Sequence, residues 1–113
     1  MARSYCSPDC PVAAALDVIG ERWSMLILRD LMLHPSRRFQ DLVESLKVAP
    51  NTLSARLATL EREGLIERRL YEQRPPRMDY VLTAKGNEVR PVLAALQTWG
   101  RKLQAGAAPA VAG

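Results

Sequence analysis

Two short stretches of regularly spaced apolar residues, separated by a brief break, constrain the fold of this chain most. In the first, Phe39, Leu42, Val43 and Leu46 follow the i, i+3, i+4, i+7 spacing of an amphipathic helix. The second opens with Pro50, which loses no hydrogen bond in a first helical turn. Its buried stripe is Leu53, Leu57 and Leu60, and Gly64 suits its C-terminal cap. Two such helices joined by a short connection are typical of a helix-turn-helix motif.

Further elements are predicted on both sides of this pair. Before it, we expect a helix from Pro11 to Gly20 and a second one over residues 25–33, ending before Pro35. After it, residues 65–71 and 78–82 are rich in strand-forming residues and predict a β-hairpin. The two prolines between these strands predict a stiff, basic loop over residues 72–77, because proline cannot donate to a strand ladder.

The final helix is expected from Thr83, which can cap it, to Leu103. Pro91 should kink this helix unless the helix effectively begins near that residue. Five of its apolar residues are spaced alternately by three and four, as in a seam that packs on a partner helix. With two residues of the first helix, they form the predicted dimer interface: Val12, Leu16, Val89, Val92, Leu96, Trp99 and Leu103.

The fold class predicted from this order is mainly α with a small β-hairpin wing, a winged helix-turn-helix. The 113 residues are enough for one domain with a single core. We expect an N-terminal arm over residues 1–10, a folded domain over residues 11–103 and a disordered tail over residues 104–113, which has little to bury.

Composition excludes several other classes of protein. No apolar run is long enough to cross a bilayer and the N-terminus lacks the apolar segment of a signal peptide, so a cytoplasmic location is expected. An enzyme is not expected, because no nucleophile with a general base and no phosphate-binding glycine loop is present. Cys6, Cys10 and the single His34 are too few for a structural zinc site, and no cofactor is predicted. We interpret Trp23 and Trp99 as core or interface anchors rather than as the lining of a small-molecule pocket.

A winged helix-turn-helix can insert its second motif helix into the DNA major groove. With the leucine stripe facing inward, the residues nearest the groove are Asn51, Thr52, Ser54, Ala55 and Arg56. Arg56 has an alternative interpretation, either a solvated side chain or an intramolecular pair, for instance with Asp41 or Glu44. Ala49 offers no side-chain cap to this helix, so water or Asn51 must satisfy some of its first N–H groups.

Arginines around the hairpin are candidates for contacts with DNA phosphates. Arg74 and Arg77 flank the expected tip, and Arg68 and Arg69 precede it. Nearby acidic residues dilute the positive charge, so we do not expect all four to bind phosphate, and we favour Arg74 and Arg77. Arg38, together with Arg37, is a further candidate just before the first motif helix. The alternative is a solvated hairpin whose charges protect a sheet edge.

Several motifs in order resemble the HxlR family of transcriptional regulators, over roughly residues 6–103. They include Cys10-Pro11-Val12, Gly20-Glu21-Arg22-Trp23, Leu28-Arg29-Asp30-Leu31, Arg38-Phe39-Gln40-Asp41-Leu42, Leu60-Glu61-Arg62-Glu63-Gly64-Leu65-Ile66 and Leu82-Thr83-Ala84-Lys85-Gly86. The resemblance implies a MarR-like homodimer that binds a palindromic operator in double-stranded DNA. It also implies a small electrophile or oxidant as an effector, sensed by a cysteine near the N-terminus.

Cys10 is the candidate sensor because it precedes a helix N-terminus, where backbone N–H groups favour a thiolate. Cys6 is close enough in sequence to resolve a sulfenic acid, and either thiol could also pair with its counterpart in a second subunit. Asp9 opposes this reactivity, and two inert thiols are the alternative.

The leading hypothesis is therefore a homodimeric DNA-binding regulator. The same pattern also fits a winged-helix module that binds only proteins.

Overall fold

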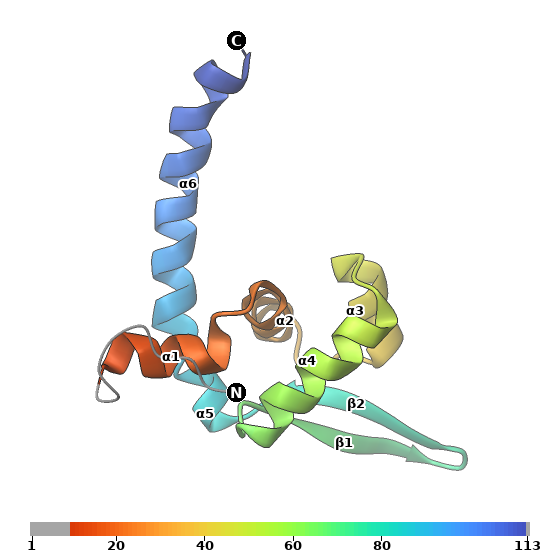
Figure 1. The fold of residues 1–113 in the computed structure, drawn as a ribbon. Coiled ribbons are helices and arrows are strands. Elements are labelled where there is room, and N and C mark those ends of the chain that lie inside the picture. Colours follow the sequence, from red (N-terminus) through yellow and green to blue (C-terminus); the bar gives the residue numbers. More distant parts are fainter. Residues whose placement is uncertain (1–9, 113) are drawn as a thin grey trace.

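The computed structural model describes residues 10–112, and the side chains of residues 10–106 (Figure 1). Six helices and one antiparallel hairpin follow one another in this part of the chain. The elements are α1 (Pro11–Ile19), α2 (Arg22–Leu33), α3 (Phe39–Leu46), α4 (Pro50–Arg62), β1 (Ile66–Gln73), β2 (Pro76–Leu82), α5 (Ala84–Asn87) and α6 (Arg90–Ala112). The predicted fold class, mainly α with a β-hairpin wing, is confirmed.

The helix-turn-helix pair α3 and α4 has the predicted bounds and local chemistry. The carboxylate of Asp41 accepts a hydrogen bond from the Arg38 N–H at 2.9 Å and so caps the start of α3. Ala49 is the N-cap of α4 and gives no side-chain hydrogen bond, as expected. The helix ends where Gly64 adopts a φ of 81°. There the N–H groups of Gly64 and Leu65 donate to Glu61 and Leu60 carbonyls, each at 3.0 Å, in a Schellman motif.

The core forms between α2 and the motif helices. Leu53, Leu57 and Leu60 of α4 are buried together with Leu42 and Leu46 of α3. From α2, the buried core residues are Ile27, Leu28 and Leu31. This packing fixes α4 by its inner stripe and leaves its opposite face without protein cover.

Helix α2 begins earlier than the sequence pattern indicates. It starts at Arg22, because the Glu21 carboxylate accepts hydrogen bonds from the N–H groups of Trp23 at 2.8 Å and Ser24 at 3.3 Å. A glutamate acting as the cap explains why a start at Met25, which rested on apolar spacing alone, was wrong.

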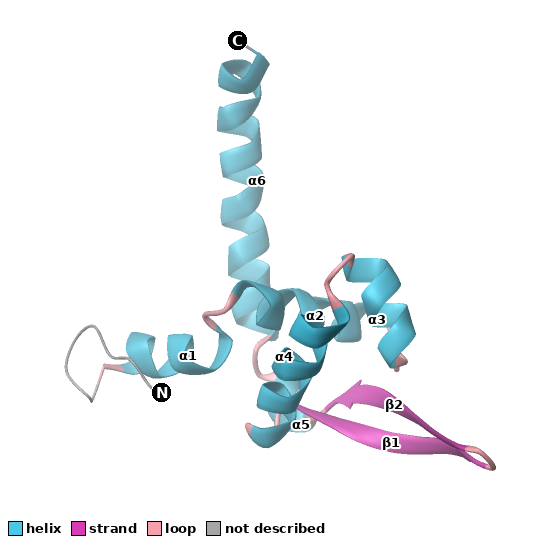
Figure 2. Cartoon of the chain, turned by 45° about the vertical axis from the view of Figure 1, so that its right-hand side comes forward, coloured by secondary structure: helices cyan, strands magenta, loops and turns pink. Residues whose placement is uncertain are grey.

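The hairpin is longer and its loop shorter than predicted. Glu72 pairs with Arg77 and Gln73 with Pro76, so the loop contains only Arg74 and Pro75, and Tyr71 is left unpaired where the register shifts. The prediction that the prolines end the ladder was wrong. Pro76 is the first residue of β2, a position where a strand tolerates proline because no ladder hydrogen bond from its N–H is needed. The hairpin extends away from the helical body (Figure 2).

The C-terminal region contains two helices rather than one. The Thr83 hydroxyl accepts a hydrogen bond from the Gly86 N–H at 3.0 Å and caps the short α5. Helix α6 begins at Arg90, so Pro91 lies in its first turn and causes no kink within it. The helix projects away from the body and continues to Ala112, past the predicted end at Leu103 (Figure 1). The disordered tail expected over residues 104–113 is thus helical up to residue 112, since this segment is rich in alanine, the best helix former.

None of the helices in the described part of the chain is both long enough and apolar enough to span a membrane.

Candidate nucleic-acid interface

The outward face of α4 carries small polar side chains at its N-terminal end. Asn51, Ser54 and Ala55 are exposed, whereas Thr52 and Arg56 are half-buried on the flanks. This arrangement follows from the buried leucine stripe. The residues between the leucines along the helix are rotated away from the core. The five residues predicted to face the groove therefore form one continuous surface at the start of the helix.

Arg56 does not form the intramolecular pair that the sequence left open. Asp41 instead caps α3 through the Arg38 N–H, and the Glu44 carboxylate accepts a hydrogen bond from the Gln40 side chain at 3.5 Å. No ion pair or side-chain hydrogen bond among the described residues includes Arg56. Its guanidinium remains available to an external acceptor.

The hairpin arginines fall into two groups. Arg68 pairs with Glu61 of α4 at 3.1 Å, and Arg69 lies 3.7 Å from the carboxylate of Asp79 on β2. Arg74 and Arg77 are exposed, and no acidic residue in the described chain forms an ion pair with either. The two hairpin arginines that form no ion pair therefore lie at its tip, where Glu72 is the cross-strand neighbour of Arg77.

Of the two arginines before α3, only Arg38 is accessible. Its exposed guanidinium lies 5.6 Å from the centre of the Tyr71 ring, within the range of a cation–π contact. Arg37 instead forms an ion pair with the buried Asp30, with Nε 3.0 Å from Oδ1, although the N–H is not aligned for a hydrogen bond. The interpretation of Arg37 as a phosphate ligand was therefore wrong, because burial commits it to Asp30.

This ion pair belongs to a cluster that joins three elements. The Ser45 hydroxyl of α3 donates a hydrogen bond to the second oxygen of Asp30 at 2.6 Å. The backbone of Arg37 exchanges two hydrogen bonds with Tyr80 of β2, at 3.1 and 2.8 Å. The cluster fixes the hairpin relative to α3. The sequence analysis missed Asp30 and Ser45, although an aspartate within the apolar stretch of residues 25–33 was a detectable signal.

Tyr80 lies where the hairpin meets α4. Burial raises the pKa of its phenol, while the nearby Arg68 lowers it by a smaller amount and Glu61 adds to the increase. The phenol is thus neutral at physiological pH and contributes no charge to the interface.

A second surface, made of α1 and α6, is apolar and exposed. It contains Val12 and Leu16 of α1 and Val92, Leu96, Trp99 and Leu103 of α6. Trp99 keeps 61% of its surface exposed and Val12 keeps 66%. Val89, which we assigned to the same surface, is half-buried against the core. We call the six exposed residues the apolar stripe.

Cys10 is the N-cap residue of α1 and is half-buried. Its side chain does not cap the helix, while its carbonyl accepts a hydrogen bond from the Ala14 N–H at 3.0 Å. Cys6 and Asp9 lie outside the described residues.

Trp23 is partly buried against the core, and the Arg22 guanidinium lies 5.2 Å from the centre of its ring. In the described part of the chain, no three His, Cys, Asp or Glu side chains gather as a metal site would require.

Comparison with known proteins identifies relatives over most of the chain. The sequence model of the family described as HxlR-like helix-turn-helix matches residues 18–107. The chain is 40% identical over 92 residues to sll1512, an uncharacterised HTH-type transcriptional regulator of Synechocystis, and the match covers 80% of this chain and 67% of that protein.

Solved structures share the fold. The redox regulator HypR in its oxidised form superposes with a TM-score of 0.75 at 30% identity, covering 82% of this chain and 96% of HypR. A MarR-family protein of Porphyromonas gingivalis superposes with a TM-score of 0.76 at 26% identity, covering 88% of this chain and 97% of that one.

Proposed function

Because this chain belongs to the HxlR-like helix-turn-helix family of transcriptional regulators, we propose that it binds a palindromic operator in double-stranded DNA as a homodimer. The observation that carries this proposal is the outward face of α4, where exposed polar residues and an arginine without an ion pair surround the start of the helix. The family consists of regulators rather than enzymes, which agrees with the absence of catalytic motifs in the sequence.

In this proposal, the first turns of α4 enter the major groove. Small side chains at the start of α4 let the helix backbone approach the base edges closely; these are Asn51, Thr52, Ser54 and Ala55. Asn51 can bond adenine with its amide, and Arg56 can bond guanine with two parallel N–H groups, a contact that discriminates by about 1–3 kcal/mol. These residues therefore determine which sequence is bound.

Arg38, Arg74 and Arg77 are proposed to contact phosphates. Arg38 lies next to the motif helices, and the other two lie at the hairpin tip, which extends beyond the body. Such contacts supply affinity and orientation without sequence preference. The ion pairs of Arg68 and Arg69 support assigning this role to the tip rather than to the base of the hairpin.

The apolar stripe is proposed as the dimer interface. An exposed row of large apolar side chains on a projecting helix is unfavourable in water, and a second copy related by a two-fold axis covers it with the same surface. Two recognition helices then face successive major grooves, about 34 Å apart along one side of the DNA.

Selection of bound DNA from a random pool tests sequence readout, half-site spacing and symmetry together. We expect an inverted repeat whose binding weakens steeply as salt rises, because each neutralised phosphate releases counterions. Arg56→Gln should bind the selected site at least tenfold more weakly, whereas Arg101→Gln, a matched change on exposed α6, should not. No enrichment of any sequence, together with salt-independent capture of protein partners, would favour the protein-binding module instead.

The proposed response to a small electrophile or oxidant rests on Cys10. Its position at the N-cap of α1, next to the stripe residue Val12, would let a modified thiol disturb the dimer. The fold similarity to the redox regulator HypR supports this part of the proposal.

Diamide oxidises two thiols to a disulfide, so it should change the operator affinity of the unmodified protein. It should also change that of Cys6→Ser if Cys10 pairs with its counterpart in a second subunit. Equal responses of the unmodified protein and Cys10→Ser would exclude Cys10 as the sensor.

A further inference from the structure

The hairpin contains a β-bulge at Tyr71. The register shifts between Leu70 and Glu72, so Tyr71 is an extra residue on β1 with no partner on β2. A bulge increases the local twist and changes the direction of a side chain relative to the regular alternation of the strand. Here the ring of Tyr71 lies beside the start of α3, and the Arg38 guanidinium is 5.6 Å from its centre. The bulge thus provides a further contact between the hairpin and the helix-turn-helix pair.

Arg38 is held at its backbone and at its guanidinium, but no acidic residue pairs with its charge. Its backbone N–H donates to the Asp41 carboxylate at 2.9 Å, and its guanidinium lies over the Tyr71 ring. No ion pair or side-chain hydrogen bond between described residues includes the guanidinium. The neighbouring arginines that are held by carboxylates instead are Arg37, Arg68 and Arg69.

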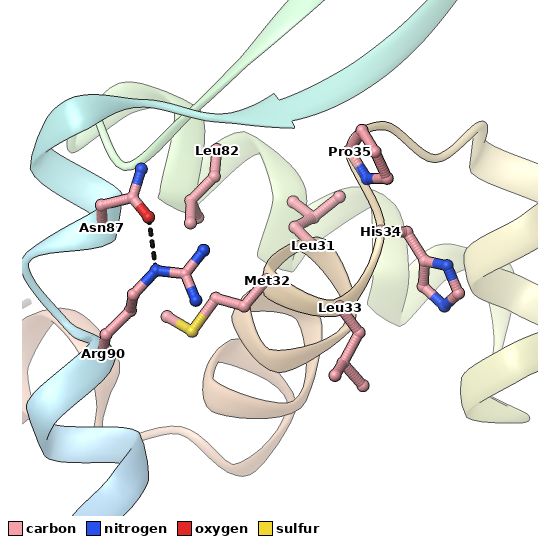
Figure 3. A pocket seen from close by; sticks show the side chains of 8 residues that line it. All are labelled: Leu31, Met32, Leu33, His34, Pro35, Leu82, Asn87 and Arg90. Atoms are coloured by element: carbon pink, nitrogen blue, oxygen red, sulfur yellow. Dashed lines mark hydrogen bonds between the residues drawn. The ribbon is translucent and has the colours of Figure 1, made fainter.

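An aromatic ring holds an arginine differently from an oxygen acceptor. An oxygen acceptor occupies one of the N–H donors, which lie in the plane of the guanidinium. Arg90 is an example, because its Nε donates to the Asn87 side-chain oxygen at 2.6 Å (Figure 3). A ring attracts the cation through its π-electrons and occupies no donor. Arg38 therefore keeps its charge and its N–H donors for an external acceptor, although its side chain is restrained.

A hollow of about 260 Å³ adjoins this pair, and its lining residues are Ser36, Arg38, Asp41, Tyr71 and Asp79. Both carboxylates already have partners. Asp41 caps α3, and the buried Asp79 lies 3.7 Å from Arg69. Their negative charge disfavours an anion inside the hollow. A phosphate therefore has to approach the Arg38 guanidinium from its solvent-exposed side, outside the hollow.

We propose that Tyr71 is a positioning residue for the phosphate contact of Arg38, an inference that rests on the proposed function. A free arginine side chain loses rotamer freedom when it binds a phosphate. A guanidinium that already lies over a ring loses less, so its contact with DNA is stronger. Because Tyr71 belongs to the hairpin, the same contact links the phosphate ligand before α3 to those at the hairpin tip, Arg74 and Arg77.

The contact between Tyr71 and Arg38 can be measured without DNA. The ring current of an aromatic side chain changes the chemical shifts of protons that lie over the ring. In NMR spectra of the full-length protein, the side-chain protons of Arg38 should therefore be shifted to lower frequency. The shift should persist in Tyr71→Phe, which keeps the ring, and disappear in Tyr71→Leu. Arg38 shifts that are the same in Tyr71→Leu and in the unmodified protein overturn the contact.

Operator binding measures what this contact does. Tyr71→Leu removes no charge, yet it should weaken binding to the selected operator by about fivefold or more, since each dimer loses two such contacts. The slope of log affinity against log salt should also fall toward that of Arg38→Gln, because an unrestrained Arg38 binds phosphate less often. Tyr71→Phe should bind as the unmodified protein does. Met78→Ala, a change of an exposed β2 side chain that does not line the hollow, is the matched control and should also leave binding unchanged.

The double variant Tyr71→Leu with Arg38→Gln separates positioning from other roles. If Tyr71 acts through Arg38, the double variant should bind as weakly as Arg38→Gln alone. Additive losses overturn the proposal, because the tyrosine then acts on the DNA or on the fold independently of Arg38. Binding by Tyr71→Phe that is as weak as binding by Tyr71→Leu also overturns it, because the hydroxyl rather than the ring is then required. Circular dichroism checks that each variant is folded.

Failure of this inference is distinguishable from failure of the proposed function. Operator affinity that is unchanged in Tyr71→Leu but lowered in Arg38→Gln overturns the positioning role alone. A protein that shows the ring-current shifts of Arg38 but selects no DNA sequence contradicts the proposed function instead.

Discussion

The dimer proposal makes its sharpest prediction at Trp99, the largest side chain of the apolar stripe. Trp99 keeps 61% of its surface exposed, which corresponds to about 150 Å² of a side chain that offers about 250 Å². Covering this area contributes up to about 4 kcal/mol per subunit at about 25 cal/mol per Å². If half of this gain is realised, two symmetric copies contribute about 4 kcal/mol, or about a thousandfold in the dimer dissociation constant.

Trp99→Ala should therefore raise the dimer dissociation constant by about a thousandfold, measured by sedimentation equilibrium over a range of protein concentrations. The isolated subunit should keep its fold, because most of this side chain contacts solvent, and far-ultraviolet circular dichroism should be unchanged. Thr98→Ala is the matched control, since it is an exposed neighbour on the same turn that points away from the stripe. A dissociation constant within twofold of the unmodified protein in Trp99→Ala would show that the stripe is not the interface.

Three further predictions concern the scaffold and the DNA contacts. Gly64→Ala should lower the free energy of unfolding in urea by about 1–2 kcal/mol, because a Cβ is disfavoured at a φ of 81°; no loss would contradict the Schellman geometry. Asp30→Ala should cost about 2–4 kcal/mol in the same assay, since it leaves the mostly buried Arg37 without its carboxylate, whereas exposed Glu44→Ala should cost under about 0.5 kcal/mol. Arg77→Gln should reduce the slope of log affinity against log salt by about 2 per dimer and leave the selected sequence unchanged, and an unaltered slope would remove Arg77 from the phosphate contacts.

The helix-turn-helix pair was predictable because its signals are local. Apolar spacing, Pro50 and Gly64 each act within a few residues, and the structure places α3 and α4 accordingly. The start of α2 and the extent of the hairpin were not predicted, because the prediction used apolar spacing alone. A glutamate cap at Glu21 and strand pairing up to Pro76 depend on geometry that apolar spacing does not encode.

The candidate interface was only partly predictable. The sequence indicated which residues of α4 face away from the leucine stripe, because helical periodicity determines direction. It could not tell Arg37 from Arg38, two adjacent arginines of which one is mostly covered and paired with Asp30 and the other is exposed. That distinction depends on how the segment after α2 folds back on Asp30, which lies only one element earlier but is brought into contact by tertiary packing.

By itself, the sequence determined the order of the elements up to the hairpin, the inward stripe of α4 and the glycine cap at its end, because each depends on interactions between near neighbours along the chain. Only the tertiary structure decided which arginines remain without an acidic partner and how the Asp30 cluster fixes the hairpin. The physical reason is that charge pairing and burial depend on the distance between elements, and packing of the core sets that distance.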